Sequence, residues 1–418
     1  MAQLSDDCFA FGGPLLPVDE ALAMLADRLS PVEGTEEVSL VELDGRVLAH
    51  DLIASMPLPP FTNSAVDGYA LDGAEIPIAK AGSFRVAGRI QAGASATVAA
   101  SPGETVRVFT GAPMPAAMDT VFMQEDVQVE GDSRVTLPPG LKRGANVRPA
   151  GEDIGIGQVA LKAGHRMRPQ DVALAAAFGL ALVEVRRRVR VAILSTGNEI
   201  VAPGTARGSA QLFDSNRFML ISMLARLGCA VEDLGILGDD RDAIAATLSA
   251  AAGNNDLILA SGGVSTGEAD YVKAAVEGVG KLVFWRLGIK PGRPVAMGVI
   301  GGTPFIGLPG NPVASFVTFT HIARPAIMAL SGTPFAPPIT VPSRAAFAYN
   351  KKAGRREYVR VHLRNAADGA LEAVKFPREG AGLLSSLVDT DGLIELGEEI
   401  TTVQPGQSVA FLPYSILL

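Results

Sequence analysis

Residues 256–272 read D-L-I-L-A-S-G-G-V-S-T-G-E-A-D-Y-V, an apolar run that breaks into a glycine-rich loop before a stretch with helical character. Residues 257–260 predict a buried strand, and the residues after the loop predict a helix with Glu268 and Asp270 at its start. Glycines in such a loop let backbone N–H groups approach an anion, and the adjacent carboxylates suit a hard cation. The segment therefore favours a strand–loop–helix unit that handles a phosphorylated ligand together with a divalent metal.

The same alternation extends on both sides of this segment. Apolar runs that predict strands occur at residues 189–196, 230–237 and 281–285, and a helical pattern separates each predicted strand from the next. Residues 311–330 predict the last helix of the series. Alternation at this spacing is typical of a parallel sheet with helices on both faces. We therefore predict a central α/β domain over residues 186–331.

The rest of the chain has a different pattern. Residues 51–141 contain short β-like runs between Gly/Pro turns, which predicts a small inserted β domain. This insertion interrupts a mainly helical N-terminal domain, predicted over residues 1–50 and 142–185. A proline-rich linker precedes residues 332–418, whose short β-like runs predict a C-terminal β barrel. The fold class is thus multidomain α/β plus β.

Composition excludes several classes of function. The 418 residues are 48% hydrophobic and carry a net charge of −8, so a large core is available and general nucleic-acid binding is disfavoured. Two distant cysteines, Cys8 and Cys229, and four scattered histidines form neither a disulfide framework nor a zinc site. The N-terminus lacks the pattern of a signal peptide, and we find no apolar run of membrane-spanning length. We expect a cytoplasmic protein without nucleic-acid or membrane partners.

Three predicted loops follow the carboxyl ends of strands, where α/β sheets bind their ligands. They are S-T-G-N-E at residues 195–199, G-D-D-R-D at residues 238–242 and the glycine-rich loop described above. Each carries acids, and carboxylates at several strand ends suit Mg²⁺ together with phosphate oxygens. Any one of these acids would also stabilise a helix N-terminus, which is the simpler interpretation for a single residue. Because three such loops belong to one sheet, we favour a site.

Positive charge gathers after the predicted strand at residues 281–285. Arg286, Lys290 and Arg293 surround K-P-G-R-P, whose prolines would aim the cations at a phosphate, although a solvated surface turn remains an alternative. Further on, L-P-G-N-P-V places Asn311 before Pro312 at a helix start, which is either a sharp turn or an anion site. The dinucleotide and P-loop glycine patterns are absent from the sequence, and no Ser–His–Asp arrangement stands out.

Eight motifs in order give the chain a family resemblance that covers residue 14 to the C-terminus. They are P-P-F-T-N-S-A-V-D-G-Y-A, R-V-F-T-G-A-P-M-P, G-A-N-V-R-P-A-G-E-D-I, S-T-G-N-E, D-S-N, S-G-G-V-S-T-G-E-A-D-Y, K-P-G-R-P and L-P-G-N-P-V. The chain resembles the MoeA-type molybdopterin molybdenumtransferases, which include the E domain of gephyrin. The resemblance implies that the α/β domain binds molybdopterin and is MogA-like, similar to the smaller adenylyltransferases that act one step earlier.

The resemblance also implies a reaction and its partners. Molybdenum from molybdate enters adenylylated molybdopterin, AMP leaves, and Mg²⁺ assists. An elongated homodimer and a transient contact with molybdopterin adenylyltransferase are further expectations. The alternatives are an adenylyltransferase, because the sheet domain alone would suit that activity, and a non-catalytic scaffold like gephyrin. A scaffold would have no need of the acids, so we expect Asp270→Ala to abolish molybdate-dependent AMP release with the fold intact.

Site residues follow from the resemblance position by position. The implied catalytic acids are Asp67, Asp153, Glu199, Asp240 (or its neighbour Asp239) and Asp270, of which Glu199, Asp240 and Asp270 are the expected metal ligands. The implied substrate-binding residues are Thr110, Arg148, Ser195, Gly262, Gly263, Ser265, Arg286, Lys290, Arg293, Pro309, Pro312, Arg355 and Arg356. Three positions depart from the family pattern: Arg286 and Arg293 replace common lysines, and Ala381 replaces a common serine. These departures affect details of oxyanion recognition.

Overall fold

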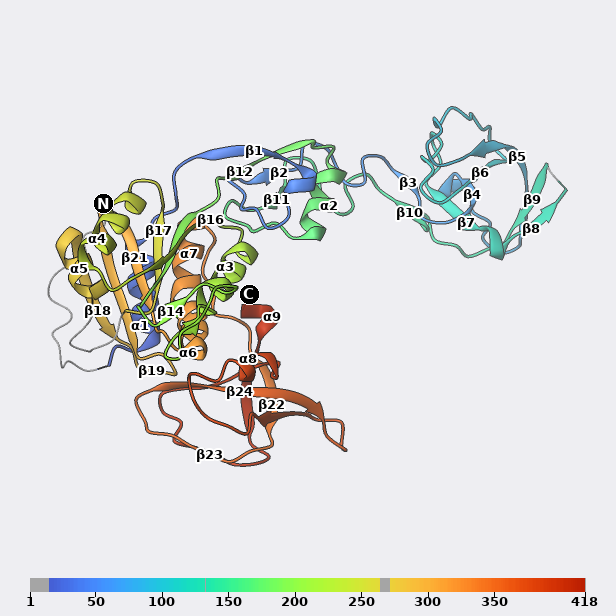
Figure 1. Ribbon diagram of the computed structural model, residues 1–418. Coiled ribbons are helices and arrows are strands. Elements are labelled where there is room, and N and C mark those ends of the chain that lie inside the picture. Colours follow the sequence, from blue (N-terminus) through green and yellow to red (C-terminus); the bar gives the residue numbers. More distant parts are fainter. Residues whose placement is uncertain (1–14, 132, 264–270, 418) are drawn as a thin grey trace. The chain divides into compact units, whose positions relative to one another are not determined.

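The computed structural model describes residues 15–131, 133–263 and 271–417, and for residues 283–286 it describes the backbone alone. The chain forms two compact units (Figure 1). Unit 1 comprises Met1–Ala49, Gly164–Arg168 and Glu184–Leu418, and unit 2 comprises His50–Ala163 and Pro169–Val183. The multidomain α/β plus β fold is confirmed.

A six-stranded sheet forms the centre of unit 1. Its strands, in spatial order, are β16 (Ala230–Leu237), β13 (Arg190–Thr196), β17 (Leu257–Ser261), β21 (Thr303–Leu308), β20 (Pro294–Ile300) and β18 (Gly280–Arg286). The first four run parallel to one another, as the alternation of strands and helices predicts. The apolar runs of β13 and β17 are continuous because both faces of these central strands are covered, whereas β16 at the edge of the sheet is only partly buried.

The other two strands extend this sheet in the antiparallel sense. β20 and β21 form a hairpin whose two-residue turn, Gly301-Gly302, has positive φ angles of 55° and 93°. Such a glycine pair permits the tight turn that joins antiparallel strands. β18 pairs with β20, also antiparallel, although it follows a helix in the sequence. The helix–strand alternation therefore predicts the strand at this position but not its direction.

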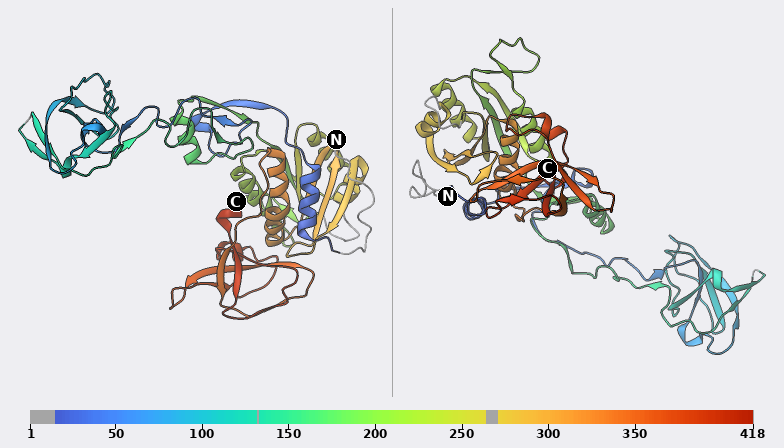
Figure 2. Two further views of the ribbon diagram at one scale, coloured as in Figure 1. Left: turned by 180° about the vertical axis from the view of Figure 1, so that it is seen from behind. Right: turned by 90° about the horizontal axis from the view of Figure 1, so that it is seen from below.

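Helices cover both faces of the sheet (Figures 1 and 2). Two groups of helices lie on opposite faces of the sheet. Val191 and Ile193 pack against the first group, and Ala192 and Leu194 pack against the second. The first group is α1 (Val18–Arg28), α3 (Asn216–Arg226), α6 (Pro312–Thr318), the π-helical turn η4 (Phe319–Ala323) and α7 (Arg324–Ser331). The second is α4 (Arg241–Ala252) and α5 (Tyr271–Val279).

The continuous stretch Pro312–Ser331 is long and apolar enough to cross a membrane by length and composition, which the sequence interpretation overlooked. Within the protein, 83% of an 18-residue window of that stretch is buried. Its apolar character is therefore used in the core beside the sheet, where it packs around Phe316, Phe319 and Ile327.

A closed β barrel forms the C-terminal part of unit 1. The pairing of β24 with both β25 and β26 closes a ring through β22 and β28. Val361, Ile394 and Phe411 lie in its core. The barrel strands are β22 (Val341–Ala345), β24 (Arg356–Asn365), β25 (Leu371–Lys375), β26 (Gly392–Leu396) and β28 (Ser408–Pro413). Smaller elements nearby are β19 (Ile289–Lys290), β23 (Tyr349–Asn350), β27 (Thr402–Val403), α8 (Ser385–Val388) and α9 (Tyr414–Leu417).

A further six-stranded sheet lies in unit 2. Its spatial order is β7 (Thr120–Met123), β4 (Gly68–Leu71), β6 (Glu104–Val108), β5 (Gly82–Ile90), β9 (Arg134–Leu137) and β8 (Gln128–Glu130). Gly68 allows β4 to approach β7 closely, because a side chain there would collide with the carbonyl oxygen of Phe122. This sheet is the inserted β structure that the sequence predicts.

Short elements complete the chain. In unit 2 they are β2 (Leu52–Ile53), β3 (Asn63–Ser64), η2 (Gly73–Glu75), η3 (Gln124–Asp126), β10 (Val147–Arg148), β11 (Val159–Leu161) and α2 (Pro169–Ala177). The others are β1 (Thr35–Ser39), η1 (Leu40–Glu42), β12 (Leu182–Arg186), β14 (Ile200–Val201) and β15 (Leu212–Phe213). The described parts of residues 1–50 and 142–185 thus hold short strands besides two helices, and the four domain boundaries stay predictions.

Candidate functional site

The carboxyl ends of β13 and β17 form the point at which the strand order reverses. From β13 the chain proceeds to β16 on one side and then returns to β17 on the other. Ser195 of β13 and Ser261 of β17 are direct partners across this pair of strands. Ligands of open α/β sheets bind at such a point, so the loops that the sequence singled out begin where a site is expected.

Buried polar side chains gather at these strand ends. We call Ser195, Thr196, Asn216 and Ser261 the strand-end cluster; each is at most 8% exposed. The Asn216 side-chain amide donates to Ser261 Oγ at 3.0 Å and to the carbonyl oxygen of Gly310 at 2.8 Å. Within the described residues, Ser195 Oγ, Thr196 Oγ1 and Asn216 Oδ1 have no hydrogen-bond partner. Because buried polar atoms are normally hydrogen-bonded, these three are available to a ligand or to water.

Gly262 and Gly263 bring the backbone against this cluster. Both have positive φ angles, 87° and 65°. A side chain at Gly263 would lie 2.4 Å from Val272 and 2.5 Å from Thr196 Oγ1, so the position requires glycine. The predicted site residues Ser265 and Asp270 lie outside the described residues.

The predicted acids in the two neighbouring loops have structural roles that are visible in the geometry. Asp240 caps α4, because its Oδ1 accepts hydrogen bonds from the backbone of Asp242 and Ala243 at 2.9 and 3.0 Å. Asn198 and Asp239 exchange backbone-to-side-chain bonds at 3.3 and 3.1 Å, which ties the two loops together. Glu199 is exposed. Across the described residues, no group of three or more His, Cys, Asp or Glu is arranged to hold a metal.

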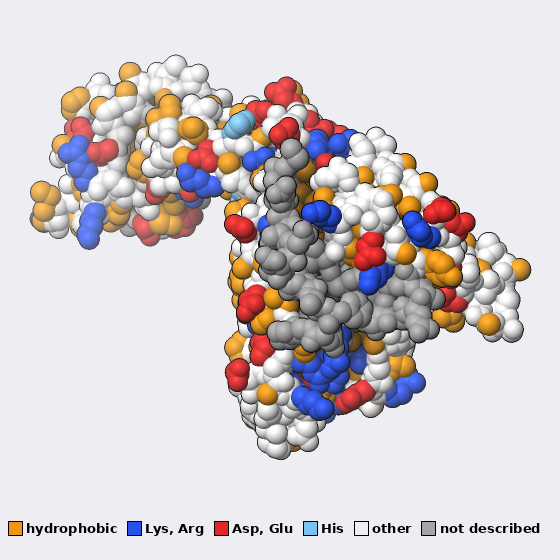
Figure 3. Space-filling view, turned by 90° about the vertical axis from the view of Figure 1, so that its left-hand side faces the viewer, with side chains coloured by type: hydrophobic (Ala, Val, Ile, Leu, Met, Phe, Trp, Pro, Cys, Tyr) orange, Lys and Arg blue, Asp and Glu red, His pale blue; other side chains and the backbone are white. Residues whose placement is uncertain are grey.

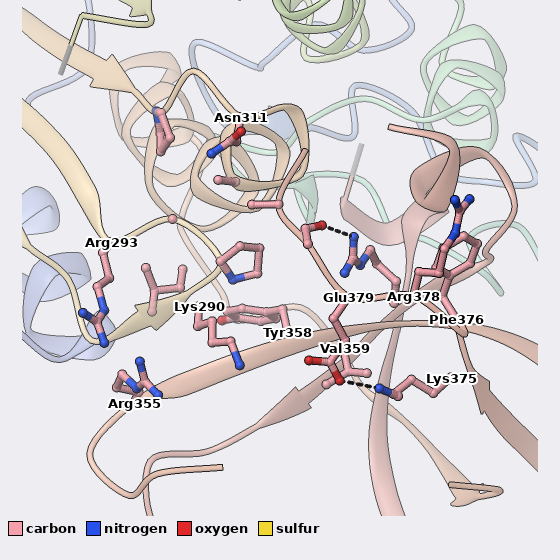
Figure 4. A pocket seen from close by; sticks show the side chains of 18 of the residues that line it. Lys290, Arg293, Asn311, Arg355, Tyr358, Val359, Lys375, Phe376, Arg378 and Glu379 are labelled. Atoms are coloured by element: carbon pink, nitrogen blue, oxygen red, sulfur yellow. Dashed lines mark hydrogen bonds and ion pairs between the residues drawn. The ribbon is translucent and has the colours of Figure 1, made fainter. Parts of the chain in front are cut away.

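A strongly cationic pocket lies between the sheet and the barrel of unit 1, with a volume of about 430 Å³. Six cations line it: Lys290, Arg293, Arg355, Arg360, Lys375 and Arg378. Figure 4 shows Lys290, Arg293 and Arg355 on one side of this cationic pocket and Arg378 on the opposite side. Lys and Arg side chains also gather on this part of the surface in Figure 3. Of the predicted residues, Lys290, Arg293, Pro309 and Arg355 line the cationic pocket.

Three of the cations, Arg360, Lys375 and Arg378, were missed by the sequence interpretation. They come from β24, β25 and the segment K-F-P-R-E-G, which are brought together by the antiparallel pairing of β24 with β25, in which Val361 lies opposite Lys375. A useful signal was nevertheless present, because this segment combines glycine, proline and charge as K-P-G-R-P does. Ala381, where a serine is common in the family, also lines the cationic pocket.

A buried carboxylate holds one side of the cationic pocket in place. Glu357 is 1% exposed, and its Oε2 accepts from Lys290 Nζ at 3.0 Å and from the Tyr349 hydroxyl at 2.9 Å. Its Oε1 lies 3.3 Å from the Arg355 guanidinium. Burial lowers the pKa of Lys290, but the hydrogen bonds that it donates to Glu357 and Tyr349 outweigh this effect, so the pKa rises above its usual value. Lys290 is therefore fully charged at neutral pH.

Arg356 and Arg355 point in different directions. Arg356 lies outside the cationic pocket and pairs with Asp19 at 2.7 Å, with Glu398 at 3.1 Å and with Glu395 at 3.3 Å. Because successive side chains of a strand face opposite sides, only one of two adjacent arginines can face the cationic pocket. Pro312 is the first residue of α6 and is not among the residues that line the cationic pocket. The side chain of Arg286 is outside the described part.

In unit 2, Asp67 and Thr110 are in contact. Asp67 Oδ1 accepts from both the backbone N–H and the hydroxyl of Thr110, each at 2.8 Å. These two bonds, the backbone one first, lower the pKa of Asp67 below its usual value. Arg148 lies on β10 opposite Asn63 of β3, and the backbone of Asp153 bonds to Leu58. Both Arg148 and Asp153 are exposed.

Comparison with known proteins identifies three family regions in the chain. Residues 16–179 match the MoeA N-terminal region (domain I and II), residues 192–329 match a probable molybdopterin binding domain, and residues 342–414 match the MoeA C-terminal region (domain IV). The α/β sheet with its strand-end cluster thus corresponds to the molybdopterin-binding class of domain, joined here to further β structure.

Relatives along the whole chain make the family specific. A protein of Haemophilus influenzae named molybdopterin molybdenumtransferase is 35% identical over 405 residues, which span 97% of this chain and 100% of that protein. One of the same name from Nostoc is 33% identical over 94% of this chain and 92% of its own length. The crystal structure of the molybdopterin biosynthesis MoeA protein of Pyrococcus horikoshii aligns with a TM-score of 0.81 at 29% identity, covering 96% of this chain and 100% of that one. The chain belongs to the MoeA family of molybdopterin molybdenumtransferases.

Proposed function

We propose that this enzyme inserts molybdenum from molybdate into adenylylated molybdopterin and releases AMP, as a step of molybdenum cofactor biosynthesis. The relatives named molybdopterin molybdenumtransferase support the reaction class. The observation that carries the proposal for this chain is the cationic pocket, whose six lysines and arginines suit a small oxyanion. Molybdate is a tetrahedral dianion at neutral pH and needs such compensation of its charge.

The cationic pocket can bind molybdate by charge-assisted hydrogen bonds. Arg293 and Arg378 are exposed, and a guanidinium group can donate in pairs to oxyanion oxygens, whereas Lys290 donates from a fixed position beside Glu357. Each charge-assisted bond contributes roughly 1.5–3 kcal/mol. Gathering several of them in one concave site concentrates molybdate where it can meet the dithiolene of molybdopterin.

The strand-end cluster suits the other substrate. Ser195 and Thr196 supply hydroxyls, Asn216 supplies an amide, and the Gly262–Gly263 backbone lies close to them. Neutral donors and close backbone approach are typical of sites that hold phosphate groups of a nucleotide. We assign the adenylylated end of molybdopterin to this cluster. The loop of Pro309 and Gly310 links both regions, because Pro309 lines the cationic pocket and the Gly310 carbonyl accepts from Asn216.

Mg²⁺ is the proposed metal, and the donor set at the neighbouring strand ends fits it. Glu199 is exposed and Asp240 caps α4 through Oδ1, and carboxylates of this kind suit a hard cation. Glu199, Asp240 and the undescribed Asp270 would hold it. When bound, the cation would offset the negative charge of the phosphate that carries AMP.

The acids of unit 2 complete the proposal. Asp67, kept ionised by Thr110, and Asp153 are proposed to act on the phosphate region of the substrate, with Arg148 as a binding cation. A homodimer, and a transient contact that passes the substrate from a molybdopterin adenylyltransferase, are proposed as the assembly. A cytoplasmic location is proposed with them.

The experiment supplies the protein with one of two mixtures. Adenylylated molybdopterin with molybdate and Mg²⁺ should yield AMP and metal-loaded cofactor. Molybdopterin with ATP and Mg²⁺ should yield no adenylylated product. Formation of that product would instead support the adenylyltransferase alternative, and inactivity in both mixtures with an intact fold would favour a scaffold.

A further inference from the structure

We propose that Glu357 is a positioning residue that determines which oxyanion the cationic pocket selects. The inference rests on the proposed function, because it assigns the cationic pocket to molybdate. Glu357 is fully buried at the start of β24 and lies behind the residues that line the cationic pocket. Its contribution is therefore made through its neighbours rather than through contact with the ligand.

Three side chains of the cationic pocket depend on this carboxylate. Lys290 and Glu357 are direct partners in the pairing of β19 with β24, and their ion pair is 3.0 Å long. Arg355 pairs with the other carboxylate oxygen at 3.3 Å. Tyr349 donates its hydroxyl to Glu357 at 2.9 Å. One buried group thus fixes two cations and an aromatic ring at a single wall.

The Tyr349 ring extends this order to a further cation. Lys290 Nζ lies 5.7 Å from the ring centroid, and Lys375 Nζ lies 5.3 Å from it. These distances are within the range of cation–π attraction. Lys375 is also paired directly with Glu379, an acid that lines the cationic pocket, so Glu357 adds to its placement through Tyr349 while it holds Lys290 and Arg355 directly.

Electrostatics alone would argue against a carboxylate here. A negative charge behind an anion pocket weakens the attraction for every anion, and burying it costs free energy unless it is well paired. What the carboxylate provides is fixed geometry, because long lysine and arginine side chains otherwise adapt to anions of many sizes. A pocket with fixed cations discriminates by fit, and molybdate is larger than sulfate because Mo–O bonds are longer than S–O bonds. We infer that Glu357 sets the preference for the larger tetrahedral oxyanion at the expense of total affinity.

The test measures dissociation constants of molybdate and of sulfate by calorimetry for the full chain and for Glu357→Gln. The substitution preserves shape but removes the charge. We expect the preference for molybdate over sulfate to fall about tenfold, the equivalent of one charge-assisted hydrogen bond, while the affinity for sulfate stays equal or increases. Loss of fold alone would weaken both ions equally, so the ratio separates positioning from general stability.

Two further variants test the same ratio of molybdate to sulfate affinity, one expected to change it and one as a control. Tyr349→Phe removes one donor to Glu357 and should lower the ratio by a smaller factor, about two- to threefold; it also tests the inference if Glu357→Gln fails to fold. Glu372→Gln is the matched control, since Glu372 pairs with Arg344 and Arg364 elsewhere on the barrel, and its ratio should equal that of the unmodified chain. An unchanged ratio in folded Glu357→Gln and Tyr349→Phe would overturn the proposed role of Glu357 and leave the assignment of the cationic pocket to molybdate standing. Absence of molybdate binding by the unmodified chain would overturn the assignment of the cationic pocket as well.

Discussion

The cationic pocket and the strand-end cluster solve the problem of holding an anion in opposite ways. The cationic pocket uses six formal positive charges on long side chains, held on one wall by the buried Glu357. The strand-end cluster uses short, neutral side chains that are buried, and three of their polar atoms have no hydrogen-bond partner among the described residues. Long charged side chains need ion pairs to fix them, whereas hydroxyls on a central strand are fixed by the sheet itself.

The difference suits two ligands of different kinds. A compact dianion such as molybdate offers only charge and four oxygens, so formal charge is the main means of binding it. An adenylylated pterin offers a large surface, so neutral donors at defined positions suffice. The two regions should therefore respond differently to substitution, to charge removal and to pH.

Substitution of the cluster's backbone should have the largest effect. In Gly263→Ala, the new methyl group would collide with Val272 and Thr196, and the positive φ would be strained. We expect a loss of about 2–3 kcal/mol in the free energy of unfolding, together with a fall of about 100-fold in affinity for adenylylated molybdopterin. Urea denaturation and calorimetry measure the two quantities.

Gly253→Ala is the matched control for this change. Gly253 ends α4 with an ordinary φ of −70°, and a side chain there would lie 3.7 Å from the Ala250 carbonyl oxygen, an ordinary contact distance. The urea midpoint of Gly253→Ala should equal that of the original chain or be slightly higher. Folded Gly263→Ala should keep its molybdate affinity; if it loses that affinity too, the two regions are not separate sites.

Removal of one exposed cation should lower the affinity of the cationic pocket for molybdate and leave the affinity for adenylylated molybdopterin unchanged. Arg293 lines the cationic pocket, and none of the ion pairs found among the described residues involves it. We expect Arg293→Ala to lower molybdate affinity by about 10- to 100-fold, with little change in stability or in affinity for adenylylated molybdopterin. Calorimetric titration measures both affinities. Arg364→Ala removes a cation from another part of the barrel and should change neither; equal losses in the two variants would argue for a general effect of charge.

A smaller effect should follow loss of a hydroxyl in the strand-end cluster. Thr196 is 2% exposed, and its Oγ1 lacks a partner among the residues described. Thr196→Val should raise the free energy of unfolding by about 1 kcal/mol, because an unsatisfied buried group is removed. Affinity for adenylylated molybdopterin should fall about tenfold. A destabilised variant with unchanged affinity would show that the hydroxyl serves the fold rather than the ligand.

Acid should lower the free energy of unfolding by a smaller amount, through a buried histidine that packs on Tyr358 of the cationic pocket. Tyr358 lines the cationic pocket and stacks on buried His321, and its hydroxyl contacts His321 Nδ1 at 3.2 Å. Burial, together with nearby Arg356 and Arg324, lowers the pKa of His321 to about 3. In the unfolded chain the histidine binds a proton below about pH 6.5. The unfolded state therefore gains protons first, and stability falls as pH drops from about 6.5 towards 3.

The expected magnitude is about 1–2 kcal/mol between pH 7 and pH 5. His321→Gln cannot titrate and should show a shallower dependence of its urea midpoint on pH over that interval. His362→Gln, at an exposed position on β24, serves as the control and should keep the original slope. An unchanged slope in His321→Gln would mean that other groups cause the acid sensitivity.

Local sequence pattern locates the strand-end cluster, although Ser195 is the only one of its four residues that was predicted as a site residue, whereas it locates only part of the cationic pocket. Apolar runs such as residues 190–196 mark central strands, and the residues that follow them must lie at one edge of the sheet, so Ser195 and Gly263 could be predicted from local pattern. The cationic pocket needs Lys290 to meet Lys375, which depends on the pairing of β19 with β24, two strands that are far apart in sequence. No local pattern encodes that pairing.

Two smaller differences have the same origin. The direction of β18 depends on its partner β20, which forms a hairpin with β21 later in the chain. The choice between Arg355 and Arg356 depends on the side to which each points where β24 begins, and a one-residue uncertainty there reverses that choice. Asp240 shows the limit of an argument from residue type, since the same carboxylate suits a cap and a metal.

The role of the cationic pocket as the molybdate site can be tested by the rate of AMP release from adenylylated molybdopterin as a function of molybdate concentration, with sulfate as the comparison ion. We expect a rate that rises with molybdate and saturates, and that responds weakly to sulfate. AMP release at the same rate without molybdate, or equal stimulation by sulfate, would contradict the claim that the cationic pocket supplies the molybdenum for insertion.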